Sequence, residues 1–354
     1  MTAPAPRPAS ALDGTPPPDV PDADLPAVSV IFPTWNRCDV VEQTIRRLAA
    51  QDYPARRVEL LVCDNSTDGT QDMVHRVAGE VDVDVVLMAS DERLPAVKRN
   101  QGLVRAGGEL VVFLNDDVWV RPDFLRRHVA HHAAVDGPVA VLGHVEQSPA
   151  MPQDPFIEWY RPFAYDRIAD RAHRTVPFWF HWSMNLSHPR DVLVDRNLVF
   201  HEDWADIGHE DVELGYRWTR AGYPVVYAPD AWGEHFHPHD LRSACRLQTS
   251  IGKGLRDLEV LVPEPDLLEH YGVCHRGSSL RGKVRGTARR ALFNRYTVPP
   301  LLDRLAEPTE RSRLAEWSYW KLMLHHTEQG YAEAPARSPR PTPTRPLADA
   351  GDRS

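Results

Sequence analysis

The stretch Glu-Leu-Val-Val-Phe-Leu-Asn-Asp-Asp-Val, residues 109–118, decides the fold of this chain. Its apolar run is rich in β-branched residues and predicts a strand that is buried on both faces. The run stops at Asn115, Asp116 and Asp117. Two adjacent carboxylates at the end of a buried strand repel each other and lose hydration, which a divalent cation relieves. The alternative is that Asp116 and Asp117 begin a turn and cap a helix that starts near Pro122.

Composition narrows the class of protein. A chain of 354 residues can bury a sizeable core, as one large domain or as two closely packed ones. The net charge of −9 argues against general nucleic-acid binding, which requires a basic surface. The cysteines are widely spaced and form no CxxC pair, which predicts free thiols in a reducing compartment and no cysteine-based zinc site; they are Cys38, Cys63, Cys245 and Cys274.

The ends of the chain differ from its centre. Residues 1–25 and 332–354 are rich in proline and poor in large apolar residues, so we predict two disordered tails. The N-terminus lacks the pattern of a signal peptide, and no apolar run approaches the roughly 18 residues that cross a bilayer. We therefore expect a cytoplasmic protein.

Residues 241–331 are predicted to form a helical C-terminal extension. A basic stretch within it favours a solvated helix face over the alternative, peripheral contact with an anionic membrane at its inner face or with a phosphorylated acceptor. Its basic residues are Arg276, Arg281, Lys283, Arg285, Arg289, Arg290 and Arg295.

Strands and helices alternate four times before residue 118. The predicted strands are 28–32, 60–63, 83–88 and the stretch quoted above, and the helices between them are 39–50, 70–77 and 95–106. This alternation predicts a mostly parallel central sheet flanked by helices, an α/β fold. Such sheets bind ligands at the carboxyl ends of their strands. Here those ends carry Thr34, Arg37, Asp64 and the Asp116–Asp117 pair.

Further along, three segments could carry chemistry. Aromatic residues between 149 and 182, with a predicted strand at 178–186, either fill core or form a stacking platform for an acceptor. Glu210 and Asp211 fall in the first turn of a helix predicted from Glu210 to Ala221, where ordinary helix capping would also place them. The alternating histidines His235, His237 and His239 are either solvated loop residues or a source of a metal ligand.

The order of these motifs resembles the inverting glycosyltransferases of family 2, which have the GT-A fold. The matching segments are Phe32–Arg37, Cys63–Thr70, Lys98–Gly102, Phe113–Asp117, Asn185 and Gly208–Leu214, with His235 placed like the late metal-binding histidine of the family. The resemblance covers about residues 28–240. It implies a half that binds nucleotide sugar, residues 26–125, and a half that binds acceptor, residues 126–240.

The resemblance also implies roles for single residues. Asp211 would be the catalytic base, with Glu210 beside it. Mn²⁺ or Mg²⁺ would be held by Asp117, Asp116 and His235. The nucleotide-diphosphate sugar would contact Pro33, Thr34, Arg37, Asp64, Lys98, Arg99, Asn115 and Asp116. The acceptor, a glycan, a lipid-linked intermediate or a small molecule, would contact Trp182, Asn185, Trp159 and Tyr160.

Three positions depart from the family pattern. Cys63 and Asn115 stand where many members have Asp, and Ser183 replaces the Gly before Asn185. Alternatives from other classes are a non-catalytic nucleotide-sugar-binding protein, a sugar nucleotidyltransferase and an NAD-dependent dehydrogenase. The last two require glycine-rich phosphate loops, and the residues after the first predicted strand are instead Pro-Thr-Trp-Asn-Arg.

Overall fold

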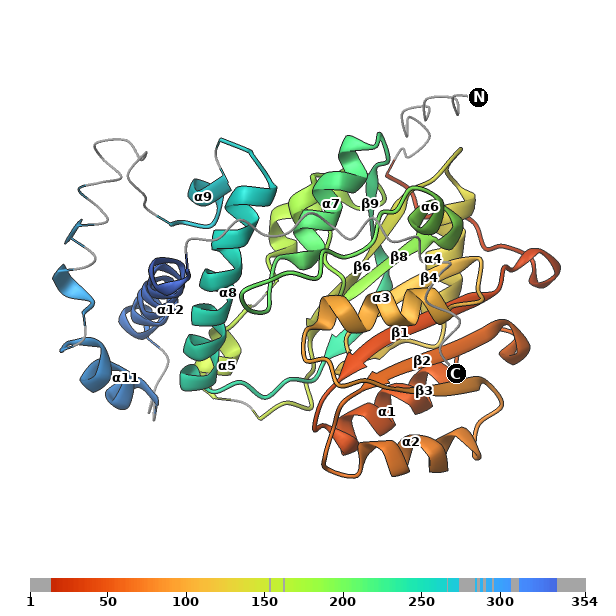
Figure 1. The fold of residues 1–354 in the computed structure, drawn as a ribbon, viewed down its shortest axis with the longest axis horizontal. Coiled ribbons are helices and arrows are strands. Elements are labelled where there is room, and N and C mark those ends of the chain that lie inside the picture. Colours follow the sequence, from red (N-terminus) through yellow and green to blue (C-terminus); the bar gives the residue numbers. More distant parts are fainter. Residues whose placement is uncertain are drawn as a thin grey trace.

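The computed structural model describes residues 14–152, 154–161, 163–265, 267–273, 284, 287–288, 291–294, 296–306 and 312–335. A nine-stranded sheet runs through it in the order β3-β2-β1-β4-β8-β6-β9-β5, with β7 paired to β9 (Figure 1). The strands are β1 (Val28–Thr34), β2 (Val58–Asp64), β3 (Asp84–Ala89), β4 (Leu110–Leu114), β5 (Val118–Val120), β6 (Ala140–Gln147), β7 (Thr175–Val176), β8 (Asn185–Pro189) and β9 (Val225–His235).

The first half of the sheet is parallel, as the alternation of strands and helices predicts. β1 pairs in parallel with both β2 and β4, and β2 with β3. The second half is mixed, because β8 is antiparallel to β4 and β6, while β6 and β9 are parallel. The predicted mostly parallel sheet therefore holds for β1–β4, and the later strands add antiparallel pairs.

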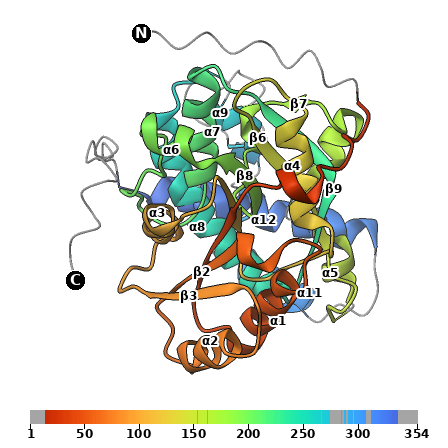
Figure 2. The same cartoon turned by 90° about the vertical axis from the view of Figure 1, so that its right-hand side faces the viewer.

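Helices pack around this sheet and continue beyond it. They are α1 (Cys38–Ala49), α2 (Thr70–Ala78), α3 (Pro95–Arg105), α4 (Phe124–Ala133), α5 (Pro155–Trp159), α6 (Arg190–Asp195), α7 (Glu210–Arg220), α8 (Leu241–Leu261), α9 (Leu267–His270), α11 (Val298–Ala306) and α12 (Arg313–Glu333). Figure 2 shows α1 and α2 together beside β2 and β3. Short 3-10 helices lie at Asp22–Asp24, Ala55–Arg57, Tyr165–Arg171 and Phe178–Phe180.

β4 is the buried centre of the sheet. All of its residues are buried, as its apolar run predicts. Asp116 and Asp117 do not cap a helix: the chain enters β5 at Val118, and α4 begins only at Phe124. The two carboxylates therefore lie between two strands of the sheet.

Two local predictions differ from the structure. Residues 178–186 do not form one strand, because His181 N–H donates to the carbonyl of Phe178 at 3.0 Å and closes a 3-10 turn, and β8 begins only at Asn185. α1 begins at Cys38, with Arg37 as its N-cap residue and Asp39 in its first turn.

The ordered domain begins earlier than expected. Within the predicted tail of residues 1–25, Leu25 is buried. Asp22 and Asp19 form ion pairs of 2.7 and 3.0 Å with Arg126 and Arg127 of α4. The segment from Asp19 to Leu25 therefore contacts the folded domain.

The helical extension is built on α8 and α12, which lie side by side (Figure 1). Gly252 allows this close approach, since an added Cβ would lie 2.1 Å from the carbonyl oxygen of Thr327. The basic residues of 276–295 that were considered for membrane contact lie outside the described residues. In the part of the chain that the structure describes, no helix has the length and apolar character to span a membrane.

Candidate active site

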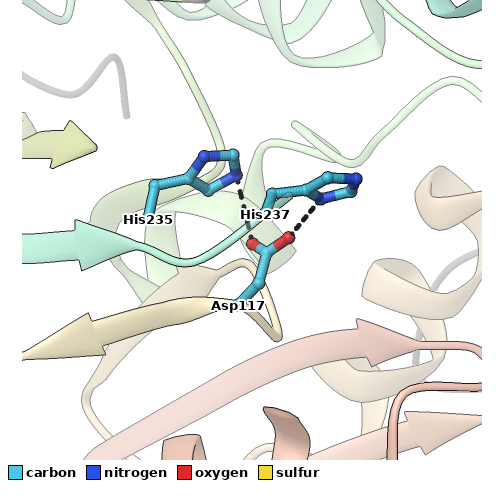
Figure 3. A group of neighbouring side chains, drawn as sticks. All are labelled: Asp117, His235 and His237. Carbon is cyan, nitrogen blue, oxygen red and sulfur yellow. Dashed lines mark hydrogen bonds and ion pairs between the residues drawn. The ribbon is translucent and has the colours of Figure 1, made fainter. Parts of the chain in front are cut away.

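Asp117 lies at the centre of a buried cluster. Its carboxylate sits between two imidazole rings (Figure 3), with Oδ1 3.3 Å from His235 Nε2 and Oδ2 2.7 Å from His237 Nδ1. Strand pairing creates this arrangement: β5 is antiparallel to β9, and Val118 pairs directly with His235. The residue after Asp117 and the last residue of β9 are thus neighbours in the sheet.

Arg37 is the counter-ion of this cluster. Its Nη1 donates to Asp116 Oδ1 at 3.2 Å and to Asp117 Oδ2, and its Nη2 lies 2.8 Å from His237 Nδ1. Burial and the charge of Asp117 raise the pKa of Asp116 to about 6. Burial alone would raise the pKa of Asp117 too, but His235, His237 and Arg37 hold it well below its usual value. Asp117 therefore stays ionised well below neutral pH, whereas Asp116 takes up a proton as the pH falls through about 6.

The donor set of the cluster fits a divalent cation. Asp117, His235 and His237 each offer one ligand atom, and these atoms lie within 4.8 Å of one another. Asp117 Oδ1 is buried without a hydrogen-bond donor among the described residues. One carboxylate and two imidazoles can coordinate a divalent transition metal, whereas Mg²⁺ prefers oxygen ligands.

The structure brings together only some of the residues predicted to bind a metal. It brings Asp117 and His235 together, whereas Asp116 directs its carboxylate to Arg37. His237 was not among the predicted ligands. The signal for it was the alternation of His235, His237 and His239, which puts every second side chain on the same side of an extended segment.

A second pair of carboxylates begins α7. Asp211 Oδ2 accepts hydrogen bonds from the backbone N–H and the hydroxyl of Ser183, at 3.0 and 3.3 Å. Glu210 Oε1 accepts from Arg99 Nη1 at 3.0 Å, and its Oε2 accepts from the N–H of Gly208. Burial and the charge of Glu210 raise the pKa of Asp211 to about 6. Asp211 is thus ionised at neutral pH and has substantial affinity for a proton.

Arg99 contacts Asn115, beside the first carboxylate pair, and Glu210 of the second pair. While Nη1 contacts Glu210, Nη2 donates to Asn115 Oδ1 at 3.2 Å. Because Asn115 precedes Asp116 and Glu210 precedes Asp211, one guanidinium links the end of β4 to the start of α7. The Asn at position 115 is therefore an acceptor for Arg99.

Lys98 has a different position from Arg99. Its Nζ donates to the carbonyl oxygen of Thr34 at 2.7 Å and to Asn65 Oδ1 at 2.5 Å, so it ties together the ends of β1 and β2. Asp64 is fully buried and its Oδ1 accepts from the N–H of Ser66 at 3.0 Å. Pro33 is partly exposed on β1.

Besides a pocket of about 620 Å³ beside Arg37 and His237, two further pockets flank these groups. One of about 490 Å³ lies beyond the end of β2 and is lined by Asn65, Ser66, Thr67, Gln71, Ala89, Ser90, Asp91 and Arg93. The other, of about 770 Å³, adjoins the histidine cluster. It is lined by His144, Val145, Glu146, Gln147, Ser148, Pro149, Glu158, Tyr160, Arg161, Phe163, Tyr165, Asp166, His235, His237 and His239. Of these lining residues, only Tyr160 and His235 were among the predicted site residues.

The residues predicted to contact an acceptor separate into three environments. Tyr160 lines the larger pocket, and Trp182 packs against Phe163 of its wall at a ring distance of 5.7 Å. Trp159 instead packs 5.4 Å from the ring of Tyr319 on α12. Asn185 is fully buried.

The contacts of Asn185 explain its burial. Its Oδ1 lies 2.9 Å from His128 Nε2, and its Nδ2 donates to the carbonyl oxygens of Ala231 and His144. Asn185 therefore fastens β8 to its neighbours and does not line the pocket. From the sequence, its turn motif alone could not show that α4 would cover the side chain.

Comparison with known proteins agrees with this architecture. Residues 29–185 match the sequence profile of Glycosyl transferase family 2. The chain is 28% identical over 269 residues to a validoxylamine A glucosyltransferase from Streptomyces hygroscopicus subsp. jinggangensis, covering 68% of this chain and 63% of the relative. It is 26% identical over 240 residues to glycosyltransferase AglE of Haloferax volcanii, covering 65% and 73%. The chain thus spans less than two thirds of the validoxylamine relative.

A solved structure shares the fold. The mannosyltransferase PcManGT from Pyrobaculum calidifontis, in complex with GDP-Man and Mn²⁺, superposes with a TM-score of 0.59 at 22% identity, covering 92% of each chain. The parallel β1–β4 half, the mixed second half and the helical extension are therefore a known arrangement. Residues 29–185 of this chain are thus similar to glycosyltransferase family 2, and the chain has the GT-A fold.

Proposed function

We propose that this protein transfers a sugar from a nucleotide-diphosphate sugar to an acceptor hydroxyl, with inversion at the anomeric carbon. The observation that carries the proposal is the pairing of two distinct sites through Arg99. One is a metal-type cluster at Asp117, and the other is a proton acceptor at Asp211. Inverting transfer requires both, since charge develops on the leaving diphosphate while the attacking hydroxyl loses a proton.

In this proposal, Asp117, His235 and His237 hold a divalent ion, with Mn²⁺ favoured over Mg²⁺. When bound, such an ion stabilises the negative charge of the departing nucleoside diphosphate as a Lewis acid. The mannosyltransferase with the same fold contains Mn²⁺, which supports this choice. The positive charge of Arg37 pairs with the carboxylates of Asp116 and Asp117 beside the proposed ion.

Asp211 is proposed as the base. The bond between the anomeric carbon and the diphosphate oxygen breaks, the acceptor oxygen forms the new bond from the opposite face, and its proton passes to Asp211. Hydrogen bonds from Ser183 fix the carboxylate, and burial keeps its pKa near the pH at which general bases work best. Glu210 raises that pKa further and is itself positioned by Arg99.

The donor is proposed to occupy residues 26–125. The pocket of about 490 Å³ beyond β2 offers amide, hydroxyl and guanidinium groups to a nucleoside, and Asp64 lies beneath its rim. Asp64 Oδ2 has no donor within the described part of the chain and is proposed to accept from the nucleotide. Thr34, Pro33 and Arg37 lie at the neighbouring strand end, and Lys98 holds that end in place.

The acceptor is proposed to occupy residues 126–240, in the pocket of about 770 Å³ beside His235. Its wall combines aromatic rings with carboxylates and Arg161, which suits a hydroxylated molecule. One relative is named for a small molecule, validoxylamine A, and another for an undecaprenol-linked glycan. We propose a hydroxyl-rich acceptor of the glycan, lipid-linked or small-molecule kind.

Aromatic substitutions distinguish the pocket from the core. We expect Tyr160→Leu to raise the apparent KM for the acceptor more than that for the donor, because Tyr160 lines the pocket. Trp159→Leu is the matched control, since Trp159 packs on the extension. It should lower the melting temperature, as lost aromatic packing costs about 3–5 kcal/mol for truncation to Ala, without a selective change in acceptor KM. Equal effects of both variants on the two KM values would contradict the pocket assignment.

A ligand screen tests the function itself. Nucleotide sugars with different bases and sugars are added with Mn²⁺, and thermal unfolding is recorded. A ligand at 100 times its Kd stabilises the native state by about 2.7 kcal/mol, which is readily seen as a rise in Tm. The proposal predicts stabilisation by one class of nucleotide sugar and slow hydrolysis of that donor. Stabilisation without hydrolysis or transfer would favour a non-catalytic nucleotide-sugar-binding protein instead.

A further inference from the structure

A second group of metal-type ligands lies outside the site described above. It consists of His131 from α4, His173 from the segment before β7, and Asp230 from β9. We propose that these three side chains bind a structural divalent transition-metal ion of the zinc type. Neither the transfer chemistry nor donor binding uses these residues.

Distances within this His-His-Asp cluster match tetrahedral coordination. His131 Nε2 lies 2.9 Å from Asp230 Oδ1 and 3.3 Å from His173 Nδ1, and the third edge, His173 Nδ1 to Asp230 Oδ1, is 3.8 Å. Zinc–nitrogen bonds of about 2.0–2.1 Å place neighbouring tetrahedral ligands about 3.3 Å apart. The three observed separations bracket that value, and a water molecule would complete the fourth position.

Hydrogen bonds among the three side chains leave part of this cluster without a partner. Three atoms that each carry a lone pair converge, and with both rings neutral at most two N–H groups are available to lie between them. Asp230 Oδ2 is buried and has no hydrogen-bond donor among the described residues. A cation provides the missing positive charge.

The cluster occupies a point where the sheet is irregular. β6 and β9 pair in register from Gly143 with Ala228, and then from His144 with Trp232, so residues 229–231 bulge out of the ladder. Asp230 lies in this bulge, and β9 continues from it to His235. An ion bound here would fasten α4 and the segment around His173 to the strand that delivers His235.

The backbone conformation of His173 is unusual and places its ring beside that of His131. Its φ of 55° is in the left-handed region, which non-glycine residues rarely adopt, and its N–H donates to the carbonyl of Tyr227 at 2.8 Å. This turns the ring onto that of His131, with centroids 5.2 Å apart and planes within 5° of parallel. For the test variant we choose Asn, because Asn tolerates this backbone conformation.

Cobalt titration tests the proposal. Full-length protein with Asp117→Ala and His235→Ala, which removes the first cluster, is titrated with Co²⁺, whose tetrahedral complexes absorb strongly in the visible range. We expect one equivalent to bind with tetrahedral spectra. Adding His173→Asn or Asp230→Asn should weaken binding by more than about 100-fold, since even a residue behind the ligands is worth 10–100-fold. His75→Ala, an exposed histidine of α2, is the matched control and should leave binding unchanged.

Thermal unfolding gives the second readout. Zn²⁺ should raise the Tm of the background protein by on the order of 5 °C and leave that of the His173→Asn variant unchanged. Melting in chelator shows that each variant is folded. The proposal is overturned if the background protein gives no tetrahedral Co²⁺ spectrum, or if His173→Asn and Asp230→Asn both retain the parent affinity.

Discussion

Asp211→Asn is expected to lower kcat by roughly 10²–10⁴ while leaving the Kd of the donor nearly unchanged. The substitution keeps the shape of the side chain and its contact with Ser183, but removes the proton acceptor. Glu210→Gln should lower kcat less, because Glu210 acts through the pKa of its neighbour and through Arg99. Both constants are measured for both variants by steady-state kinetics and equilibrium binding.

The pH dependence provides an independent check of Asp211. Its pKa of about 6 predicts that kcat/KM falls as the pH drops through 6, as the carboxylate takes up a proton. In Glu210→Gln this limb should move to lower pH, because one negative charge is removed. An acidic limb that is unchanged in both variants would move the base elsewhere. His209 is the next candidate, although burial lowers its pKa to about 4.

The melting temperature of Asp211→Asn shows whether its lower kcat reflects lost catalysis or lost folding. The pKa of Asp211 in the folded protein lies above its ordinary value of 3.8, so its ionised form opposes folding. This penalty is absent below pH 3.8, develops as the pH rises from 3.8 to about 6, and is constant above that. A neutral Asn does not carry this ionisation penalty at pH 7. The loss of the charge should therefore not lower the Tm of Asp211→Asn below that of the parent. A large loss of kcat with a preserved Tm would identify a catalytic role.

Asp117→Ala is expected to lower kcat/KM by at least about 10³, equivalent to roughly 4 kcal/mol of transition-state stabilisation. The substitution removes the anionic ligand between His235 and His237 and leaves Arg37 without its closer carboxylate. Nucleoside diphosphate affinity should fall as well, because the proposed ion bridges protein and diphosphate.

Mn²⁺ titrations measure both effects of Asp117→Ala. The parent should lose activity in chelator and regain it with Mn²⁺, whereas the variant should respond weakly. Asp72→Ala, an exposed aspartate of α2, is the matched control and should behave like the parent. Full activity of the parent in chelator would remove the metal from the proposal.

The sequence predicts the first half of the fold because its signals are local. Each of β1 to β4 is a short apolar run that ends in polar residues, and each helix between them has amphipathic spacing. The carboxyl ends of parallel strands meet at one edge, so Asp64 and Asp116–Asp117 could be placed together before the structure was known. The end of β2 and the end of β1 are level, since Thr34 pairs with Asp64.

In the second half, the helix that begins at Glu210 was predicted, but the packing of the strands and of α4 was not, because it depends on long-range contacts. The local sequence does not show that His131 lies on the buried face of α4. Nor does it show that a bulge in β9 places Asp230 beside this histidine. The same holds for Asn185, whose motif suggested a binding residue and whose environment makes it a structural one. His237 is an intermediate case: its alternation with His235 was visible in the sequence, but only the β5–β9 pairing brings Asp117 beside it.

The anomeric configuration of the product, measured with Mn²⁺ and with chelator, is the most direct test of metal-dependent transfer with inversion. The protein is incubated with Mn²⁺, a hydroxylated acceptor and the nucleotide sugar that stabilises it most, and the anomeric configuration of the product is read by NMR. The account predicts a product of inverted configuration, formed with stoichiometric release of nucleoside diphosphate and abolished by chelator. A product of retained configuration, or one formed equally well in chelator, would contradict it.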